Sequence, residues 1–318
     1  MKRILHTILT LAFAVSATVS VKAQDEATFH HYLANPFLVN PAAAGFEGKH
    51  QVFAHSRSQW AGFPGAPNTY ALTYSGALGK KVGLGAMVMS ENFAALNRFR
   101  GQLAYAYSYG TKEYKLGMGF STEFNRTRVT AGAAGNPLIT RNDYLIEDAM
   151  QGVTYLDAAV GMNLLIKDRI FVGVAVPNLV HTRLGVINDT TRKQITFFRH
   201  FLGYGGYRFN IGESTMLEPS LMVRKPLNAP FEADFNLRTT FLNDQFMAGL
   251  TYRPGRSGAV ALMAGIRQGG FQLNYSYSAS IAEFNNYSRD GHEISLGVEI
   301  RKQEIDPKTK KKKKKYRN

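Results

Sequence analysis

Apolar and polar residues alternate with a period of two along most of this chain. In residues 231–241, one face carries Phe231, Ala233, Phe235, Leu237 and Phe241, and the opposite face carries Glu232, Asp234, Asn236, Arg238 and Thr240. Successive side chains of a β-strand point to opposite faces of its sheet, so this period is that of a strand with one apolar and one polar face. The pattern recurs between Gln51 and Ile300 and predicts an all-β fold.

The alternating runs are long enough to cross a lipid bilayer. We expect fourteen strands, in chain order Gln51–Ser58, Thr69–Ala77, Val82–Ser90, Phe99–Tyr109, Tyr114–Val129, Thr154–Ile166, Ile170–Val176, Phe197–Phe209, Met216–Arg224, Phe231–Leu242, Gln245–Tyr252, Ala259–Arg267, Phe271–Ser278 and His292–Ile300. Several reach the roughly 9 to 11 residues that a tilted transmembrane strand needs, whereas strands of soluble proteins usually have about 5 to 6. An even number of antiparallel strands is typical of bacterial outer-membrane barrels. The chain is therefore predicted to form a transmembrane antiparallel β-barrel.

Long and short connections alternate between these strands. The longer ones are Gln59–Asn68, Glu91–Arg98, Thr130–Val153, Pro177–Thr196, Lys225–Pro230, Arg253–Gly258 and Ala279–Gly291, and turns such as Asn243–Asp244 lie between them. Outer-membrane barrels have long external loops and short periplasmic turns. We therefore expect both termini in the periplasm and the longer connections outside the cell.

The first residues have the pattern of an export signal. Lys2 and Arg3 precede an apolar stretch from Ile4 to Val19, and Val21-Lys22-Ala23 is a small-x-small cleavage pattern. We expect a signal peptide at residues 1–23, with Gln24 as the first mature residue. No later run approaches the roughly 20 apolar residues of a membrane-spanning helix.

Residues 24–50 precede the barrel of residues 51–300 and carry two Asn-Pro pairs. Asn35-Pro36 and Asn40-Pro41 prevent a continuous helix, because proline removes a backbone donor and restricts the residue before it. The aromatic residues of this stretch would be costly to leave in water. We expect a plug-like segment that packs on the barrel, and a flexible periplasmic lead is the alternative.

The formal net charge of +15 is concentrated at the two ends of the chain. Residues 1–23 are basic, and the Lys-rich tail at residues 301–318 contains Lys310, Lys311, Lys312, Lys313, Lys314 and Lys315. The rest is close to neutral, which argues against a nucleic-acid partner. We expect a periplasmic tail that is either solvated or docked on anionic lipid or an acidic partner. The chain has no cysteine, so disulfides and thiolate metal sites are excluded.

Three sets of residues are of types that can carry chemistry. His30-His31 beside Asp25 and Glu26 could bind a metal ion, but neighbouring histidines near a terminus are more often solvated. His55-Ser56 and Arg199-His200 have no assignable catalytic geometry and fit a lumen. Glycines at Gly83-x-Gly85 and Gly203-x-Gly205-Gly206 lie in strand patterns and indicate bends or close approach. We expect no enzyme activity, no cofactor and no metal site.

An ordered set of short motifs resembles the PorP/SprF family of type IX secretion outer-membrane proteins. The set comprises Gln24-Asp25, Phe29, Tyr32, Asn35-Pro36, Asn40-Pro41-Ala42, Gly45, Arg57-x-Gln59-Trp60, Pro64-Gly65, Val174–Leu179, Arg199-His200, Gly206–Phe209, Leu217-Glu218-Pro219-Ser220, Tyr275-Ser276-Tyr277 and Gly291–Leu296. Each motif alone is weak, and the specificity comes from their order. The likeness covers nearly all of residues 24–300, and the lysine run is a departure from it.

This resemblance implies an outer-membrane barrel similar to the long-chain fatty-acid transporter type, working in protein secretion or gliding motility. The implied partners are outer-membrane lipid and periplasmic secretion subunits, a secreted client protein, or both. The motif residues Asn35, Pro36, Asn40, Pro41, Arg57, Trp60, Arg199, His200, Glu218 and Pro219 are candidates for contacts with them. A transporter of hydrophobic small molecules is the alternative function, which the barrel type alone would permit.

Overall fold

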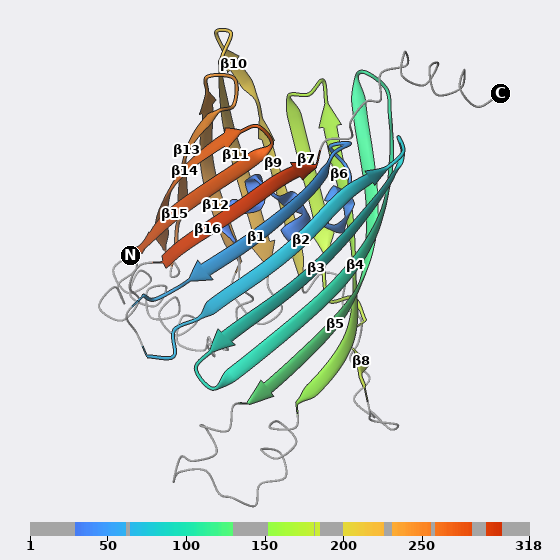
Figure 1. The fold of residues 1–318 in the computed structure, drawn as a ribbon, viewed down its shortest axis with the longest axis vertical. Helices are drawn as coiled ribbons and strands as arrows, with labels where there is room; N and C mark the ends of the chain where they lie inside the picture. The colour runs from blue at the N-terminus through green and yellow to red at the C-terminus, as the bar shows by residue number, and fades with distance from the viewer. Residues whose placement is uncertain are drawn as a thin grey trace, which may run out of the picture.

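A computed structural model describes residues 29–61, 64–129, 152–180, 182–184, 200–225, 231–255, 258–281 and 291–300. These residues form one antiparallel sheet that closes into a β-barrel (Figure 1). Among them, none of the helices has the length and apolar character needed to cross a membrane. The predicted signal peptide at residues 1–23 and the Lys-rich tail at residues 301–318 lie outside the described residues.

The strands follow one another around the barrel in nearly sequential order. Their bounds are β1 His50–Ser58, β2 Asn68–Leu78, β3 Val82–Phe93, β4 Leu96–Gly110, β5 Tyr114–Val129, β6 Val153–Ile166, β7 Ile170–Val176, β8 Thr182–Arg183, β9 Phe201–Tyr207, β10 Phe209–Ile211, β11 Thr215–Lys225, β12 Glu232–Phe241, β13 Phe246–Arg253, β14 Ala259–Gln268, β15 Phe271–Ser280 and β16 Gly291–Ile300. The first strand pairs with the last, because β1 is hydrogen-bonded to both β2 and β16. The sheet also continues between β7 and β11, since β9 pairs with both. The ladder is therefore complete around the barrel.

The predicted fourteen-stranded antiparallel barrel is confirmed, with local differences. The predicted strand Phe197–Phe209 appears as β9 and β10, which are interrupted at Arg208. The short β8, which pairs with β6, was not predicted.

The predicted long loop Glu91–Arg98 is wrong. Strand pairing continues to Phe93 and Leu96, so β3 and β4 are joined by a short turn. Glu91 and Arg98 face each other across the two strands, and Arg98 Nη1 lies 2.9 Å from Glu91 Oε2. The additional cross-strand pairs of this hairpin are polar. No alternation of apolar and polar residues therefore marks these positions as strand in the sequence.

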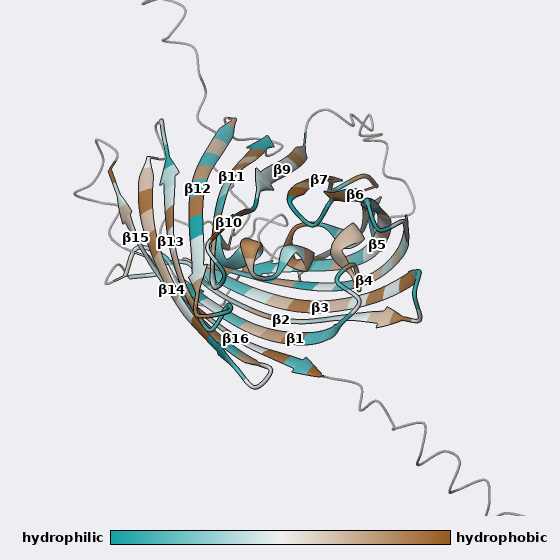
Figure 2. Cartoon of the chain, turned by 90° about the horizontal axis from the view of Figure 1, so that it is seen from above, coloured by the Kyte–Doolittle hydropathy of each residue, from teal (hydrophilic) through white to brown (hydrophobic). Residues whose placement is uncertain are grey.

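The predicted faces of the strands are confirmed on β12. Phe235 is 51% exposed on the outer surface, whereas Asp234 and Asn236 are buried on the inner side. Apolar outer side chains and polar inner ones are what a barrel in lipid requires. Figure 2 shows this alternation of hydrophobic and hydrophilic positions along the strands.

Residues 29–46, called the luminal segment below, lie inside the barrel (Figure 2). They contain three short 3-10 helices, η1 His30–Leu33, η2 Pro36–Leu38 and η3 Pro41–Ala43. A proline opens η2 and η3, where its missing N–H costs no helical hydrogen bond. The predicted break of helical structure at the two Asn-Pro pairs takes the form of these separate single turns.

Candidate functional site

The inner wall of the barrel beneath η3 carries two transverse rows of small residues. One row consists of register partners on β2 to β7, namely Ala77, Gly83, Ala106, Gly119, Gly161 and Ala175. The next row, on β2 to β6, consists of Ser75, Gly85, Ala104, Ser121 and Ala159. Because neighbouring strands all lack large inward side chains at this height, the backbone of the luminal segment can approach the wall closely.

Glycine is required where the backbone or an aromatic ring of the luminal segment meets this wall. A Cβ on Gly83 would overlap the carbonyl oxygen of Ala44, and one on Gly119 would overlap the backbone of Ala42. A Cβ on Gly85 would overlap the ring of Phe37. The interpretation of Gly83-x-Gly85 as a site of close approach is therefore confirmed, and the approaching element is the luminal segment itself.

Apolar side chains of the luminal segment pack into three small cores against the wall. Phe37 packs with Met87, Ala104 and Ala106, and Phe29 packs with Ala71 and Met89. Tyr32 packs with Tyr204 and Met222 on the opposite side. These three aromatic side chains are buried. Their burial favours the observed position by roughly 1.5–3 kcal/mol for a side chain such as phenylalanine.

Asn40 anchors the second Asn-Pro turn to β6 and β7. Its Nδ2 lies 3.1 Å from the carbonyl oxygen of Met162 and 3.3 Å from that of Val174. Its Oδ1 accepts a hydrogen bond from the backbone N–H of Ala42, with an N–O distance of 2.9 Å. The side chain therefore caps η3 and binds the wall at the same time.

Asn35 anchors the first Asn-Pro turn to β1 and β2. Its Nδ2 donates to Thr73 Oγ1 at 2.8 Å and lies 3.0 Å from Nε2 of His55. Both candidate asparagines are thus buried within the lumen and bound to the wall. Neither is available at an outer surface.

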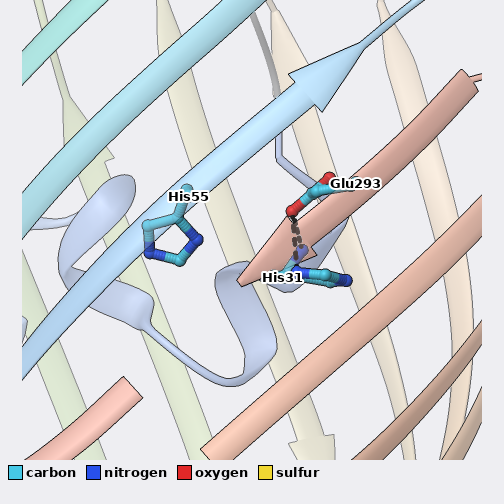
Figure 3. Close-up of side chains that lie close together, drawn as sticks. All are labelled: His31, His55 and Glu293. Carbon is cyan, nitrogen blue, oxygen red and sulfur yellow. Dashed lines mark hydrogen bonds and ion pairs between the residues drawn. The ribbon is translucent and has the colours of Figure 1, made fainter. Parts of the chain in front are cut away.

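A compact cluster of polar side chains joins η1 to the first and last strands. Figure 3 shows His31 of η1, His55 of β1 and Glu293 of β16 close together, with interactions marked between His31 and Glu293. Glu293 accepts hydrogen bonds from two backbone N–H groups, that of His30 at 2.8 Å and that of His31 at 3.0 Å. Nδ1 of His31 lies 3.2 Å from Oε1 of Glu293. We call His31, His55 and Glu293 the His–Glu cluster.

The pairing of β1 with β16 places two further residues beside the His–Glu cluster. Arg57 lies opposite Glu293, and its Nη1 is 3.5 Å from Glu293 Oε2. Ser295 lies opposite His55, and its hydroxyl contacts both imidazoles, with 2.7 Å to Nδ1 of His55. All five side chains are buried. The carboxylate is thus held by two backbone donors and one guanidinium.

Burial determines the protonation state of His31. Desolvation, followed by the nearby positive charge of Arg57, lowers the pKa of His31 to about 3. The ring is therefore neutral near pH 7 and keeps one nitrogen lone pair.

The expectation that His30 and His31 are solvated is wrong. Their exposed fractions are 8% and 0%, and the partners of His31 come from distant strands. One nitrogen of each imidazole in the His–Glu cluster and one oxygen of Glu293 lie within 4.8 Å of one another, so these residues could hold a metal ion. Glu293 and His55 fall on polar faces of their strands in the sequence, but their meeting with His31 depends on the position of the luminal segment.

The opposite wall holds a second polar group around Glu218. Its carboxylate pairs with Arg208, at 2.9 Å, and with Arg238, at 2.7 Å. Nη1 of Arg238 donates to the carbonyl oxygen of Leu33 at 3.1 Å. Nδ2 of Asn236, on the same strand, donates to the hydroxyl of Tyr32 at 2.9 Å. The luminal segment is therefore bound to both sides of the barrel.

The remaining sequence candidates include two residues of the luminal segment and several outside it. Pro36 and Pro41 begin η2 and η3, and Pro219 lies within β11 opposite Leu237. Trp60 follows β1 and packs edge-on against Phe93. His200 precedes β9, with its Nδ1 2.7 Å from Nδ2 of Asn178, and Arg199 lies outside the described residues. The candidates therefore divide into a group that contacts the luminal segment or belongs to it and a group elsewhere on the barrel.

A cavity of about 500 Å³ lies beside the luminal segment. Its lining includes Lys115, Asp168, Arg208, Glu218 and Asp244. Asp168 belongs to the turn between β6 and β7, and Asp244 to the turn between β12 and β13. The cavity is therefore located toward the end of the barrel that carries the short turns, and it mixes both signs of charge.

Comparison with known proteins places this architecture. The family described as type IX secretion system membrane protein PorP/SprF matches residues 21–298. No curated protein matches the chain. Among solved structures, the toluene transporter TbuX of Ralstonia pickettii superposes with a TM-score of 0.51 and 9% identity, covering 83% of this chain and 93% of that one. The monoaromatic hydrocarbon channel CymD gives 0.54 and 10%, covering 85% of this chain and 93% of that one.

At these identities the solved structures support the shared barrel fold alone. The family match, by contrast, spans both the luminal segment and the barrel. The described strands carry an apolar outer face and a polar inner face, as an outer-membrane protein requires. The chain therefore belongs to the PorP/SprF family of type IX secretion system membrane proteins and is an outer-membrane β-barrel.

Proposed function

We propose that the luminal segment closes this barrel, and that the closed barrel supports protein secretion, gliding motility or both through protein contacts. In this role it anchors periplasmic machinery of the type IX system or serves one exported client protein. The observation that carries the proposal is the attachment of the luminal segment to opposite walls, through Glu293 on one side and Arg238 on the other. A segment attached to both walls in this way is not expected in a barrel that functions as an open channel.

Buried polar contacts make the filled state specific. Asn40 and Asn35 each place an amide among wall acceptors, and withdrawing them would leave buried partners without hydrogen bonds. An unsatisfied buried group costs about 1–3 kcal/mol. Several such contacts, together with three apolar cores, support a segment that stays seated during function.

The periplasmic end offers charged groups to a protein partner. The cavity at the short-turn end presents lysine, arginine and carboxylate groups beside Phe46 of the luminal segment. The Lys-rich tail at residues 301–318 would leave β16 on this same side if both termini are periplasmic. We propose that the tail docks electrostatically on an acidic periplasmic subunit, which would give the barrel its orientation relative to the machinery.

Transport of hydrophobic small molecules is the second candidate function. The solved structures named above include a toluene transporter and a monoaromatic hydrocarbon channel. A cavity of about 500 Å³ also falls in the size range of small-ligand sites. The segment that fills the space beside the cavity favours the secretion role, because a permeating molecule would have to pass it.

Two measurements separate these functions. A strain lacking this chain should lose one or more exported proteins from its secretome, and proteoliposomes containing the purified barrel should take up toluene no faster than empty liposomes. An intact secretome together with rapid toluene uptake would reverse the assignment. Proteoliposomes with a variant lacking residues 29–46, checked for a folded barrel, should conduct small ions, which tests closure separately.

A further inference from the structure

We propose that His31, His55 and Glu293 form a binding site for a divalent metal ion of the zinc type, which fastens the luminal segment to the seam where β1 meets β16. The inference goes beyond the proposed function, since it holds whether the barrel anchors machinery, serves a client or transports a small molecule. It rests on the donor set, its geometry and its position in the fold.

The distances suit a small ion. One donor atom from each residue lies within 4.8 Å of the other two, and Nδ1 of His31 is 3.2 Å from Oε1 of Glu293. Two ligands with metal bonds of about 2.0–2.2 Å in tetrahedral arrangement are separated by roughly 3.3–3.5 Å. The His31–Glu293 pair already has about this separation, and a modest inward movement of His55 completes the triangle.

The donor chemistry selects the class of ion. Two imidazoles and one carboxylate form a ligand set typical of zinc, whereas calcium and magnesium prefer oxygen donors alone. Both imidazoles are buried, at 0% and 3% exposure, so their ring nitrogens are directed into the cluster and not toward solvent. The hydroxyl of Ser295 contacts both rings and is the neighbouring oxygen that would have to shift when an ion binds.

Surrounding groups orient two of the three ligands, His55 and Glu293, as metal sites require. Ligating histidines usually bind a second group through the other ring nitrogen, and ligating carboxylates are hydrogen-bonded in turn. Nε2 of His55 is in contact with the amide of Asn35, which can present its oxygen after a half-turn. Glu293 is held by the backbone N–H groups of His30 and His31.

One atom has no role in the hydrogen-bond network. Within the described part of the chain, Nε2 of His31 is buried without a partner, which leaves the network of the cluster incomplete on this ring. If the proton resides on Nε2, the lone pair of Nδ1 faces Oε1 of Glu293 at 3.2 Å and can accept from the hydroxyl of Ser295. A cation between the ring and the carboxylate would bind both acceptors.

Arg57 sets the strength of binding. Its guanidinium lies 3.5 Å from the other oxygen of Glu293 and already balances the carboxylate. An incoming dication therefore meets like charge, and we expect an affinity below that of closed structural zinc sites. Removing this charge with Arg57→Gln should raise zinc affinity, whereas a merely structural salt bridge predicts no gain.

The position explains what the ion would do. His31 lies on the luminal segment, His55 on the first strand and Glu293 on the last. A single ion would therefore join the luminal segment to both the first and the last strand of the barrel. A ligand that binds the folded state alone raises stability in proportion to the logarithm of its concentration.

The test uses full-length protein without a histidine tag, purified from outer membranes in detergent. Zinc should raise the thermal midpoint of unfolding, a chelator should lower it, and cobalt should give the visible absorption of a tetrahedral site. His31→Gln should abolish all three effects, and because this residue lies outside the strands, heat-modifiable mobility can confirm that its barrel still forms. His55→Gln and Glu293→Gln should behave in the same way.

Matched controls are His50→Gln and His292→Gln, whose rings contact Tyr74 and Tyr275 instead of the cluster. Both should keep the full zinc response. Equal zinc responses in the wild type and in His31→Gln would overturn the proposal, as would a wild type that shows neither a zinc shift nor cobalt absorption. In either case the cluster would act through hydrogen bonds alone.

Discussion

The side-chain oxygen of Asn40 occupies the space that a Cβ on Gly161 would need. Asn40 belongs to the luminal segment and Gly161 to β6, so one missing side chain on the wall admits the residue that anchors η3. Gly161 and Gly119 are register partners, and both are covered by residues of the same turn. A single added carbon atom on either glycine would therefore overlap the luminal segment.

We expect Gly161→Ala to destabilise the folded protein by about 1–3 kcal/mol, because the added methyl group overpacks a filled site. The folded fraction can be measured by heat-modifiable gel mobility across a urea series. Gly203→Ala is the matched control, since a Cβ there would lie 3.5 Å from the nearest atom, an ordinary contact. Equal losses in the two variants would show that glycine matters only for strand formation.

A double-mutant cycle tests whether Asn40 is the group that Gly161 accommodates. Asn40→Ala alone should destabilise the protein by about 0.5–2 kcal/mol through the lost cap. In that background Gly161→Ala should cost less than in the wild type, because the overlapping oxygen is gone. Strictly additive effects would contradict the contact between these two residues.

Phe235→Arg tests the assignment of faces on β12. Phe235 is 51% exposed on the outer surface, so a charge there would enter lipid and cost about 2–4 kcal/mol near the midplane. Phe235→Leu keeps an apolar side chain and should retain nearly all of the folded barrel in the same urea series. A lumen-facing Phe235 would instead give comparable losses for the two variants.

The topology can be tested with single cysteines, because the chain has none of its own. Cysteines at Asn142 and Asn188, which lie outside the described residues, should react with a membrane-impermeant thiol reagent on intact cells. A cysteine at Asp168, in the turn between β6 and β7, should react only after the outer membrane is opened. The reverse pattern would place the short turns outside the cell.

Truncation after Ile305 tests the proposed docking of the Lys-rich tail. Loss of the lysine run should leave the barrel folded and reduce co-purification of periplasmic partners at low salt. Exposed charges are screened over about 8–10 Å at ordinary ionic strength, so rising salt should weaken binding of the full-length protein in the same way. Undiminished co-purification at low salt would leave the tail as a solvated extension.

Local periodicity was sufficient to predict the barrel wall. In a strand such as β12, the apolar and polar faces can be identified from that strand alone, because burial alternates residue by residue along the chain. The break between β9 and β10 at Arg208 and the extension of the β3–β4 hairpin escaped this reasoning. In that hairpin the pairs are polar, so no apolar period marks the strand.

The contacts of the luminal segment could not be predicted in the same way. Its apolar residues and its Asn-Pro turns indicated a packed segment, but the partners of His31 are Glu293 and Ser295, more than 260 positions away. The presence of the luminal segment also changes the expected effect of substituting Asn236. Asn236→Arg would look harmless on a polar face, yet it would remove the hydrogen bond that Asn236 donates to the hydroxyl of Tyr32.

The two rows of small residues imply an order of assembly. They lie on β2 to β7, in the first half of the chain that follows the luminal segment and β1, whereas Glu293 lies on the final strand. Contacts across short stretches of chain cost less loop-closure entropy than contacts across long ones. We therefore expect the segment to settle on its half of the wall while the sheet is still open. The pairing of β16 with β1 would then bring Glu293 to the waiting backbone of His30 and His31, so that this carboxylate can be satisfied only in a barrel that has closed around its contents.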